Sequence, residues 1–105
     1  LTVQGALPPR ARAAVGREVV DAYYAEESAK GLDPVVKFLT RHKLNVTTLS
    51  KVGNAGELIA KTAESGKFDL VIMGSRGHGA LGSLVMGSVA TKVLASCGTP
   101  VLLVR

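Results

Sequence analysis

The stretch that most constrains the fold is residues 68–96, in which an apolar run, a glycine cluster and a second apolar run follow one another. The first run, FDLVIM, carries a single charge, Asp69, near its start, and predicts a parallel strand that is buried on both faces. The second run, residues 87–96, has helical spacing and predicts a helix. The inward stripe of that helix would be Val89, Val93 and Leu94.

A strand, a glycine loop and a helix in this order predict a cradle for an anion. Glycine has no Cβ and tolerates positive φ, so backbone N–H groups can approach a charged ligand closely. The first turn of the helix adds unpaired N–H groups and the positive end of the helix dipole. Ser88 and Thr91 lie within one turn of the helix start and would add hydroxyl donors. In open parallel sheets, ligands bind at this carboxyl end of the strands.

The amino-terminal part of the chain predicts a strand and a long helical region. Residues 1–4 predict the end of a strand, and the loop after it contains Pro8 and Pro9, which would exclude regular structure there. Residues 13–42 have helical spacing that is interrupted at Gly31 and Pro34. This region predicts either two helices or one long kinked helix.

Two further strands and one helix complete the pattern. Residues 45–52 are rich in β-branched side chains and predict a strand, as does the run that begins at Pro100 and ends at Val104. Between the first of these strands and residue 68, the segment NAGELIAKTAESG predicts a helix that is capped by Asn54 and ended by Gly66.

Alternating strands and helices of these lengths indicate the α/β class. Right-handed crossovers would join the strands into a three-layer α/β/α open parallel sheet. A chain of 105 residues is long enough for one domain, so we expect residues 1–105 to form a single domain with one core.

Charge and composition exclude several classes of partner. The net charge of +5 comes from 13 basic and 8 acidic side chains, but the basic residues are scattered and no aromatic residues lie between them, so we expect no nucleic acid. The uncharged residues 77–91 are too few and too rich in Gly and Ser to span a membrane. Cys97 is the single cysteine and no leader sequence is visible, so we expect a cytoplasmic protein.

Several phosphate-binding motifs compete for the glycine loop. A Walker loop is excluded because no lysine follows any of these glycines. Gly77, Gly79 and Gly82 fit a dinucleotide fingerprint, but they lie well before the helix, so this match is weak. The spacing that matches is Gly, two residues, Gly, nine residues, Gly, Ser, at Gly74, Gly77, Gly87 and Ser88.

This spacing resembles the nucleotide-binding motif of the universal stress protein family. The resemblance extends over KVGNAGELIAKTAESGKFDLVIMGSRGHG and the closing TPVLLVR, and so covers about the last 60 residues of the chain. It implies the Rossmann-like fold of the adenine nucleotide α-hydrolase type and a bound ATP. AMP and cyclic AMP are the other adenine nucleotides to consider.

The resemblance also implies roles for individual residues. Ser75, Arg76 and Gly77 would wrap the phosphates. Gly87 and Ser88 would hold the phosphates from the helix start, with Val89 beside them. Met73 and Gly74 would lie near the ribose, and Val3 would form a wall for adenine. His78, from its place in the loop, would either contact a phosphate when protonated or remain an exposed loop histidine.

Members of the family begin with a strand that carries an Asp near its end, and this chain begins at what resembles their second strand. By this comparison the first strand and first helix, roughly 35 to 40 residues, are missing from a domain of the usual size. The missing strand is central in the family's sheet, so the two halves of the sheet would not pair and two strand edges would face a gap. The acidic residue expected on the adenine side has no counterpart here.

The predicted function is that of a binding module or switch. No acidic residue follows Asp69, so the loop offers no carboxylate for catalysis, and any Mg²⁺ would be held by phosphates, Ser or Thr hydroxyls and water. The resemblance implies a homodimer joined through the last strand. Two alternatives stay open: a dimeric stress regulator that binds no nucleotide, and a slow ATP hydrolase.

Overall fold

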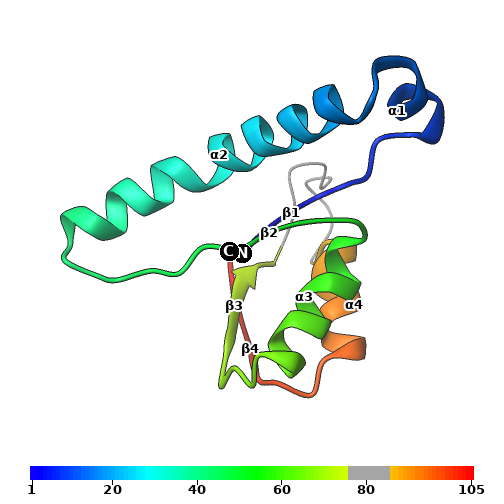
Figure 1. The fold of residues 1–105 in the computed structure, drawn as a ribbon. Coiled ribbons are helices and arrows are strands. Elements are labelled where there is room, and N and C mark those ends of the chain that lie inside the picture. The colour runs from blue at the N-terminus through cyan, green and yellow to red at the C-terminus, as the bar shows by residue number, and fades with distance from the viewer. Residues whose placement is uncertain (76–85) are drawn as a thin grey trace. The chain divides into compact units, whose positions relative to one another are not determined.

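The computed structural model describes residues 1–75 and 86–105, which fall into two compact units, one in Leu1–Asn54 and the other in Ala55–Arg105. Each unit combines a pair of parallel strands with two helices (Figure 1). The α/β class predicted from the sequence is confirmed. The described strands form two pairs, β1 with β2 in the first unit and β3 with β4 in the second.

In the first unit, strand β1 (Thr2–Gln4) lies parallel to strand β2 (Ser50–Val52), with Thr2 opposite Ser50. The strand predicted over residues 45–52 is therefore real but shorter. The first residues of the predicted strand have no pairing partner because β1 has only three residues. The hydrogen bonds between the two strands begin with the N–H of Thr2, which donates to the carbonyl of Leu49 at 2.9 Å.

The helical region of this unit is divided at a different place from the one predicted. Helix α1 (Pro9–Val15) begins at Pro9, so the prediction that Pro9 excludes regular structure was wrong. At the first helical position an N–H has no partner within the helix, so proline costs nothing there. The break falls at Gly16, where φ is +84°, and helix α2 (Arg17–Arg41) then continues through Gly31 and Pro34.

Helix α2 is fixed on β1 by one polar side chain and a close backbone approach. The Gln4 Nε2 amide donates to the carbonyl of Tyr24 at 2.7 Å and to Ser28 Oγ at 2.6 Å. At Gly31 an added Cβ would lie 3.4 Å from Thr2 Oγ1, so α2 approaches the strand closely at this turn. Val20, in the first turns of α2, is buried, with an exposed fraction of 6%.

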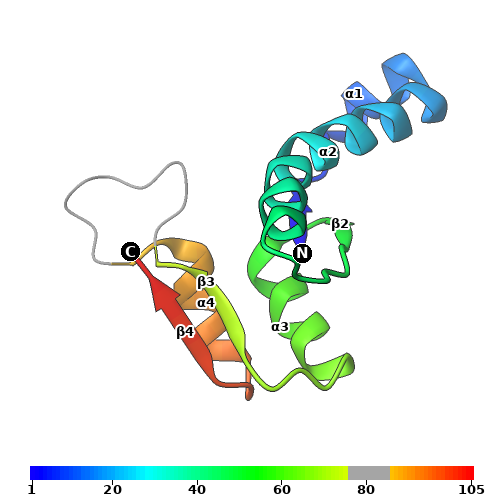
Figure 2. The same ribbon diagram turned by 90° about the vertical axis from the view of Figure 1, so that its left-hand side faces the viewer.

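The second unit contains α3 (Ala55–Ser65), β3 (Val71–Gly74), α4 (Ser88–Ser96) and β4 (Val101–Val104). Helix α3 starts directly after Asn54 and ends directly before Gly66, as predicted. The two helices lie side by side (Figures 1 and 2) and meet through small side chains, which allows their axes to approach closely. The buried apolar residues in the described part of this unit are Ala60, Ala63, Ala90 and Val93.

Two predictions about burial in this unit were wrong. Strand β3 is not buried on both faces: Ile72 has an exposed fraction of 64%, whereas its neighbours Val71 and Met73 are half-buried. A two-stranded sheet with one covered face gives this alternation. On α4, Val93 is buried as predicted, but Leu94 is 44% exposed, and the second buried residue is Ala90, one turn before Val93.

Helices α2 and α3 are each followed by a lysine in the left-handed conformation. At the end of α3, Lys67 has φ of 53°, its N–H donates to the carbonyl of Glu64, and the N–H of Phe68 donates to that of Ala63. This is the hydrogen-bond pattern of a Schellman motif, in which glycine is the usual residue. Lys43 closes α2 in the same way, with φ of 58°.

We therefore expect Lys67→Gly to raise the free energy of unfolding by about 1 kcal/mol, because glycine removes the steric cost of the left-handed conformation. Urea denaturation measures the change. The matched control is Lys61→Gly in the middle of α3, which should lower the free energy of unfolding by about 1 kcal/mol. A loss of stability in both variants would contradict the proposed role of the Lys67 conformation.

Candidate functional site

The end of β3 and the start of α4 are joined by a backbone hydrogen bond. The N–H of Gly87 donates to the carbonyl of Ser75 at 2.7 Å, and the N–H of Ser75 donates to the carbonyl of Val104 on the neighbouring strand at 2.8 Å. Ser75 is buried, with an exposed fraction of 7%. The predicted arrangement of strand end and helix start is thus present.

The first turn of α4 has the properties of an anion-binding helix terminus. Gly87 is the N-cap residue, and the first helical bond runs from the N–H of Thr91 to the Gly87 carbonyl at 3.1 Å. The N–H groups of Ser88, Val89 and Ala90 precede that bond, so they have no partner within the helix. In the described part of the chain no side chain caps this terminus, and its first turn holds no acidic residue. The positive end of the dipole is therefore uncompensated by the helix itself.

The hydroxyl of Thr91 does not serve the site in the predicted way. Thr91 Oγ1 donates to the carbonyl of Gly87 at 3.0 Å, one turn back along the helix. Threonine in a helix commonly makes this bond. The hydroxyl proton of Thr91 is then donated to the carbonyl and not to a ligand. Ser88, by contrast, is exposed at the start of the helix, so of the two predicted hydroxyl donors only Ser88 remains.

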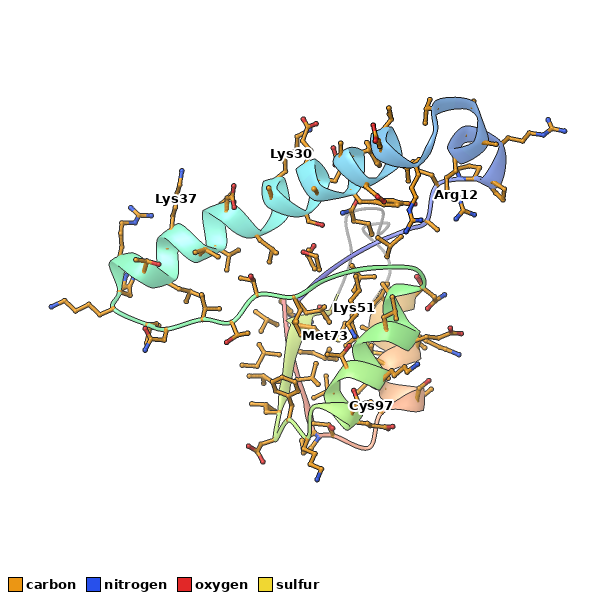
Figure 3. The ribbon with its side chains drawn as sticks, viewed as in Figure 1. Arg12, Lys30, Lys37, Lys51, Met73 and Cys97 are labelled. Atoms are coloured by element: carbon orange, nitrogen blue, oxygen red, sulfur yellow. The ribbon has the colours of Figure 1, made fainter. Side chains whose placement is uncertain are left out.

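A cavity of about 560 Å³ opens at the carboxyl ends of β3 and β4. It is lined by Ile72, Met73, Gly74, Ser75, Val104 and Arg105. Met73 lies toward the end of β3 (Figure 3) and is half-buried. A volume of this size is typical of sites for small ligands.

The structure brings together six of the predicted site residues. Met73, Gly74 and Ser75 lie at the strand end, and Gly87, Ser88 and Val89 lie at the helix start. Arg76, Gly77 and His78 lie outside the described residues. Val3 lies in the middle of β1, in the first unit, and its role at adenine stays a prediction.

Sequence reasoning missed Val104 and Arg105 as parts of the site. The strands are parallel and Gly74 lies opposite Val104, so the residues that follow each strand share one edge. The predicted parallel sheet could have indicated these two residues, because the carboxyl ends of parallel strands meet at the same edge of the sheet. Arg105 adds a positive charge to the lining of the cavity.

The described residues hold no candidate metal centre and no candidate membrane span. Among them, no group of three or more His, Cys, Asp or Glu side chains gathers as a metal centre would require. None of the helices in residues 1–75 and 86–105 combines the length and apolar character of a membrane span.

Comparison with known proteins decides the family. The family model described as "Universal stress protein family" matches residues 2–105. The chain belongs to the universal stress protein family. A universal stress protein of Thermus aquaticus is 51% identical over 53 residues, which cover 50% of this chain and 39% of that protein. Universal stress protein MJ0531 of Methanocaldococcus jannaschii is 31% identical over 88 residues, covering 84% of this chain and 52% of the relative.

The solved structure of MJ0577, a universal stress protein of the same archaeon, confirms the fold. It matches with a TM-score of 0.78 and 28% sequence identity, over 98% of this chain and 70% of the MJ0577 chain. This universal stress protein chain spans about half, or less, of the length of the relatives that it matches, with shares of 39%, 52%, 21% and 49%.

Proposed function

We propose that this universal stress protein binds ATP at the junction of β3 and α4 and acts as a nucleotide-dependent binding module or switch in a stress response. The observation that carries the proposal is the 2.7 Å hydrogen bond from Gly87 to Ser75, which holds the helix start beside the strand end. Family membership and the complete glycine spacing from Gly74 to Ser88 support the same ligand.

The described residues fit a polyphosphate. The backbone N–H groups of Ser88, Val89 and Ala90 would bind phosphate oxygens, and the lack of a side chain on Gly87 allows a close approach. Arg76, Gly77 and His78 would complete the phosphate side, and the cavity beside Met73 and Gly74 would take the ribose. Val3 is the residue proposed for adenine. AMP and cyclic AMP would engage the helix start less, because they carry fewer phosphate charges.

Mg²⁺, if it accompanies ATP, would be held by phosphate oxygens, water and the hydroxyl of Ser88. Oxygen ligands and bound water suit this small hard cation. It would supply charge neutralisation between the phosphates. The residues of this chain would orient the phosphates and exclude water from one side of them, which is sufficient for a binding function.

We further propose that two copies associate through β4. Among the described strands, β4 pairs with β3 alone, so its other edge retains free N–H and C=O groups. Leu102, which does not line the cavity proposed for the ribose, is 50% exposed, and a second copy would cover it. The proposed compartment is the cytoplasm, which supplies the nucleotide.

The test is to measure ATP affinity by isothermal titration calorimetry in the unmodified chain and in Ser88→Asp. A carboxylate at the first helical position should repel the phosphates and weaken ATP binding by about tenfold or more. The same carboxylate favours the helix dipole, so the fold should be retained or slightly stabilised.

The matched control is Ser96→Asp, which adds the same charge at the last residue of α4. It should leave ATP affinity within about twofold of the unmodified protein, since dipole effects fade within one turn. Equal ATP affinity in the unmodified chain and in Ser88→Asp, or no ATP binding by the unmodified chain, would refute the proposed site.

A further inference from the structure

The first unit contains a cavity that the proposed nucleotide site does not use. It has a volume of about 430 Å³ and lies between α1 and α2. Arg12, in the last turn of α1, and Arg17, in the first turn of α2, both line it. The left-handed φ of +84° at Gly16 makes the turn that brings these two helix ends together.

The inner wall of this cavity is fixed by packing and by a hydrogen bond. Val20 is buried, with an exposed fraction of 6%, and Tyr24 is half-buried beside it. The hydroxyl of Tyr24 accepts a hydrogen bond of 2.9 Å from the backbone N–H of Leu7. The tyrosine ring is therefore held in place as an apolar wall of the cavity, which the two arginines also line.

The charges of the two arginines that line this cavity are largely uncompensated. Residues 9–17 contain three arginines and no acidic residue. Arg12 makes no ion pair with any residue in the described part of the chain. Arg17 Nε lies 3.9 Å from Asp21 Oδ2, but these side chains are 94% and 69% exposed, so the pair is weak and the guanidinium can still bind another anion.

Farther along α2, the basic residue Lys30 is paired with carboxylates. Lys30 Nζ lies 3.1 Å from Glu27 Oε1 and 3.7 Å from Glu26 Oε1, and the hydrogen bond and charge of Glu27, together with the charge of Glu26, raise the pKa of Lys30. That cation already has its partners. Figure 3 labels Arg12 and Lys30 and shows that they lie on different helices, well separated along the unit. Unlike Lys30, Arg12 has no carboxylate partner among the described residues, and it lines the cavity.

We propose that the cavity between α1 and α2 binds a small molecule that carries oxyanion groups, of phosphate or dicarboxylate chemistry. Two guanidinium groups offer planar forks that match such oxyanions, and the Tyr24 ring provides an apolar surface for the body of the ligand. The volume suits a small molecule rather than a macromolecule. Asp21 also lines the cavity, and its carboxylate opposes the anion, so it limits the affinity of the site.

The experiment is an NMR titration of the full chain at low ionic strength, with pyrophosphate and with succinate as separate probes. It is done in the unmodified chain and in Ser88→Asp, so that binding at the proposed nucleotide site is recognised and subtracted. Shifts at the backbone and side-chain N–H groups of Arg12 and Arg17, and at Tyr24, are expected in both backgrounds. A response to pyrophosphate alone identifies phosphate chemistry, and a response to succinate alone identifies carboxylate chemistry.

Three variants separate this site from general electrostatic attraction. Arg12→Gln should weaken binding by about tenfold, because it removes one charged pair of donors. Arg10→Gln is the matched control, since Arg10 lies on the same helix but does not line the cavity, and it should change affinity by less than about twofold. Asp21→Asn should strengthen binding. No shift at Arg12, Arg17 or Tyr24 with either probe, or equal losses in Arg12→Gln and Arg10→Gln, would overturn the proposal.

Discussion

Replacing Val93 by Asp is expected to unfold the second unit. Val93 is fully buried between the helices and the strands, with an exposed fraction of 0%. A carboxylate at this position would lose its hydration in a core whose other buried apolar residues include Ala60, Ala63 and Ala90. We expect the free energy of unfolding to fall by about 4 kcal/mol or more, a large part of the stability of a small domain.

The adjacent residue provides the control for this experiment. Leu94 is 44% exposed, so Leu94→Asp should change the free energy of unfolding by less than about 1 kcal/mol. Urea denaturation followed by circular dichroism compares the two variants. Similar losses in both would mean that α4 is rotated relative to the described structure, with Leu94 facing the core as the sequence pattern predicted.

Replacing Gly87 by Trp is expected to abolish ATP binding. Gly87 is buried at the N-cap of α4, and its N–H holds the helix start against Ser75. An indole at this position would occupy the space from which phosphates approach the first-turn N–H groups. We expect ATP affinity to fall by about a hundredfold or more, since several charge-assisted hydrogen bonds would be lost together.

Gly98→Trp is the control of the same size. No atom lies within 4 Å of a Cβ added at Gly98, which follows α4 in the chain, so the indole should point into solvent there and leave ATP affinity unchanged. Circular dichroism and thermal unfolding establish that Gly87→Trp keeps its fold; the smaller Ser88→Asp change tests the same site if it does not. Unchanged ATP affinity in a folded Gly87→Trp would exclude the cradle.

The sequence predicted the α/β class and most of the elements because helical spacing and apolar runs are local signals. The helix after Asn54 begins where its capping residue indicated, and the helix predicted over residues 87–96 begins at Ser88. The strand end at Gly74 and the helix start at Ser88 also lie where the glycine spacing placed them. These features depend on residues that are close together in the chain.

The errors concern properties that depend on the partners of an element. Residues 45–49 have strand-like composition, but β1 is too short to pair with them. Leu94 is as apolar as Val93, and only the position of α3 decides which of them faces the core. Thr91 was expected to contact a ligand, but a carbonyl one turn away takes its proton. Composition alone cannot distinguish these cases.

The hydrogen bond between Ser75 and Gly87 joins two backbone groups, so it does not depend on the side chain at either position. It fixes both ends of a segment of eleven residues, 76–86, and the cost of closing a loop rises only slowly with its length. The segment can therefore be exchanged for sequences of other lengths and charges while the strand end and helix start keep their places. Grafting such segments onto this frame is a route to proteins that recognise other anions.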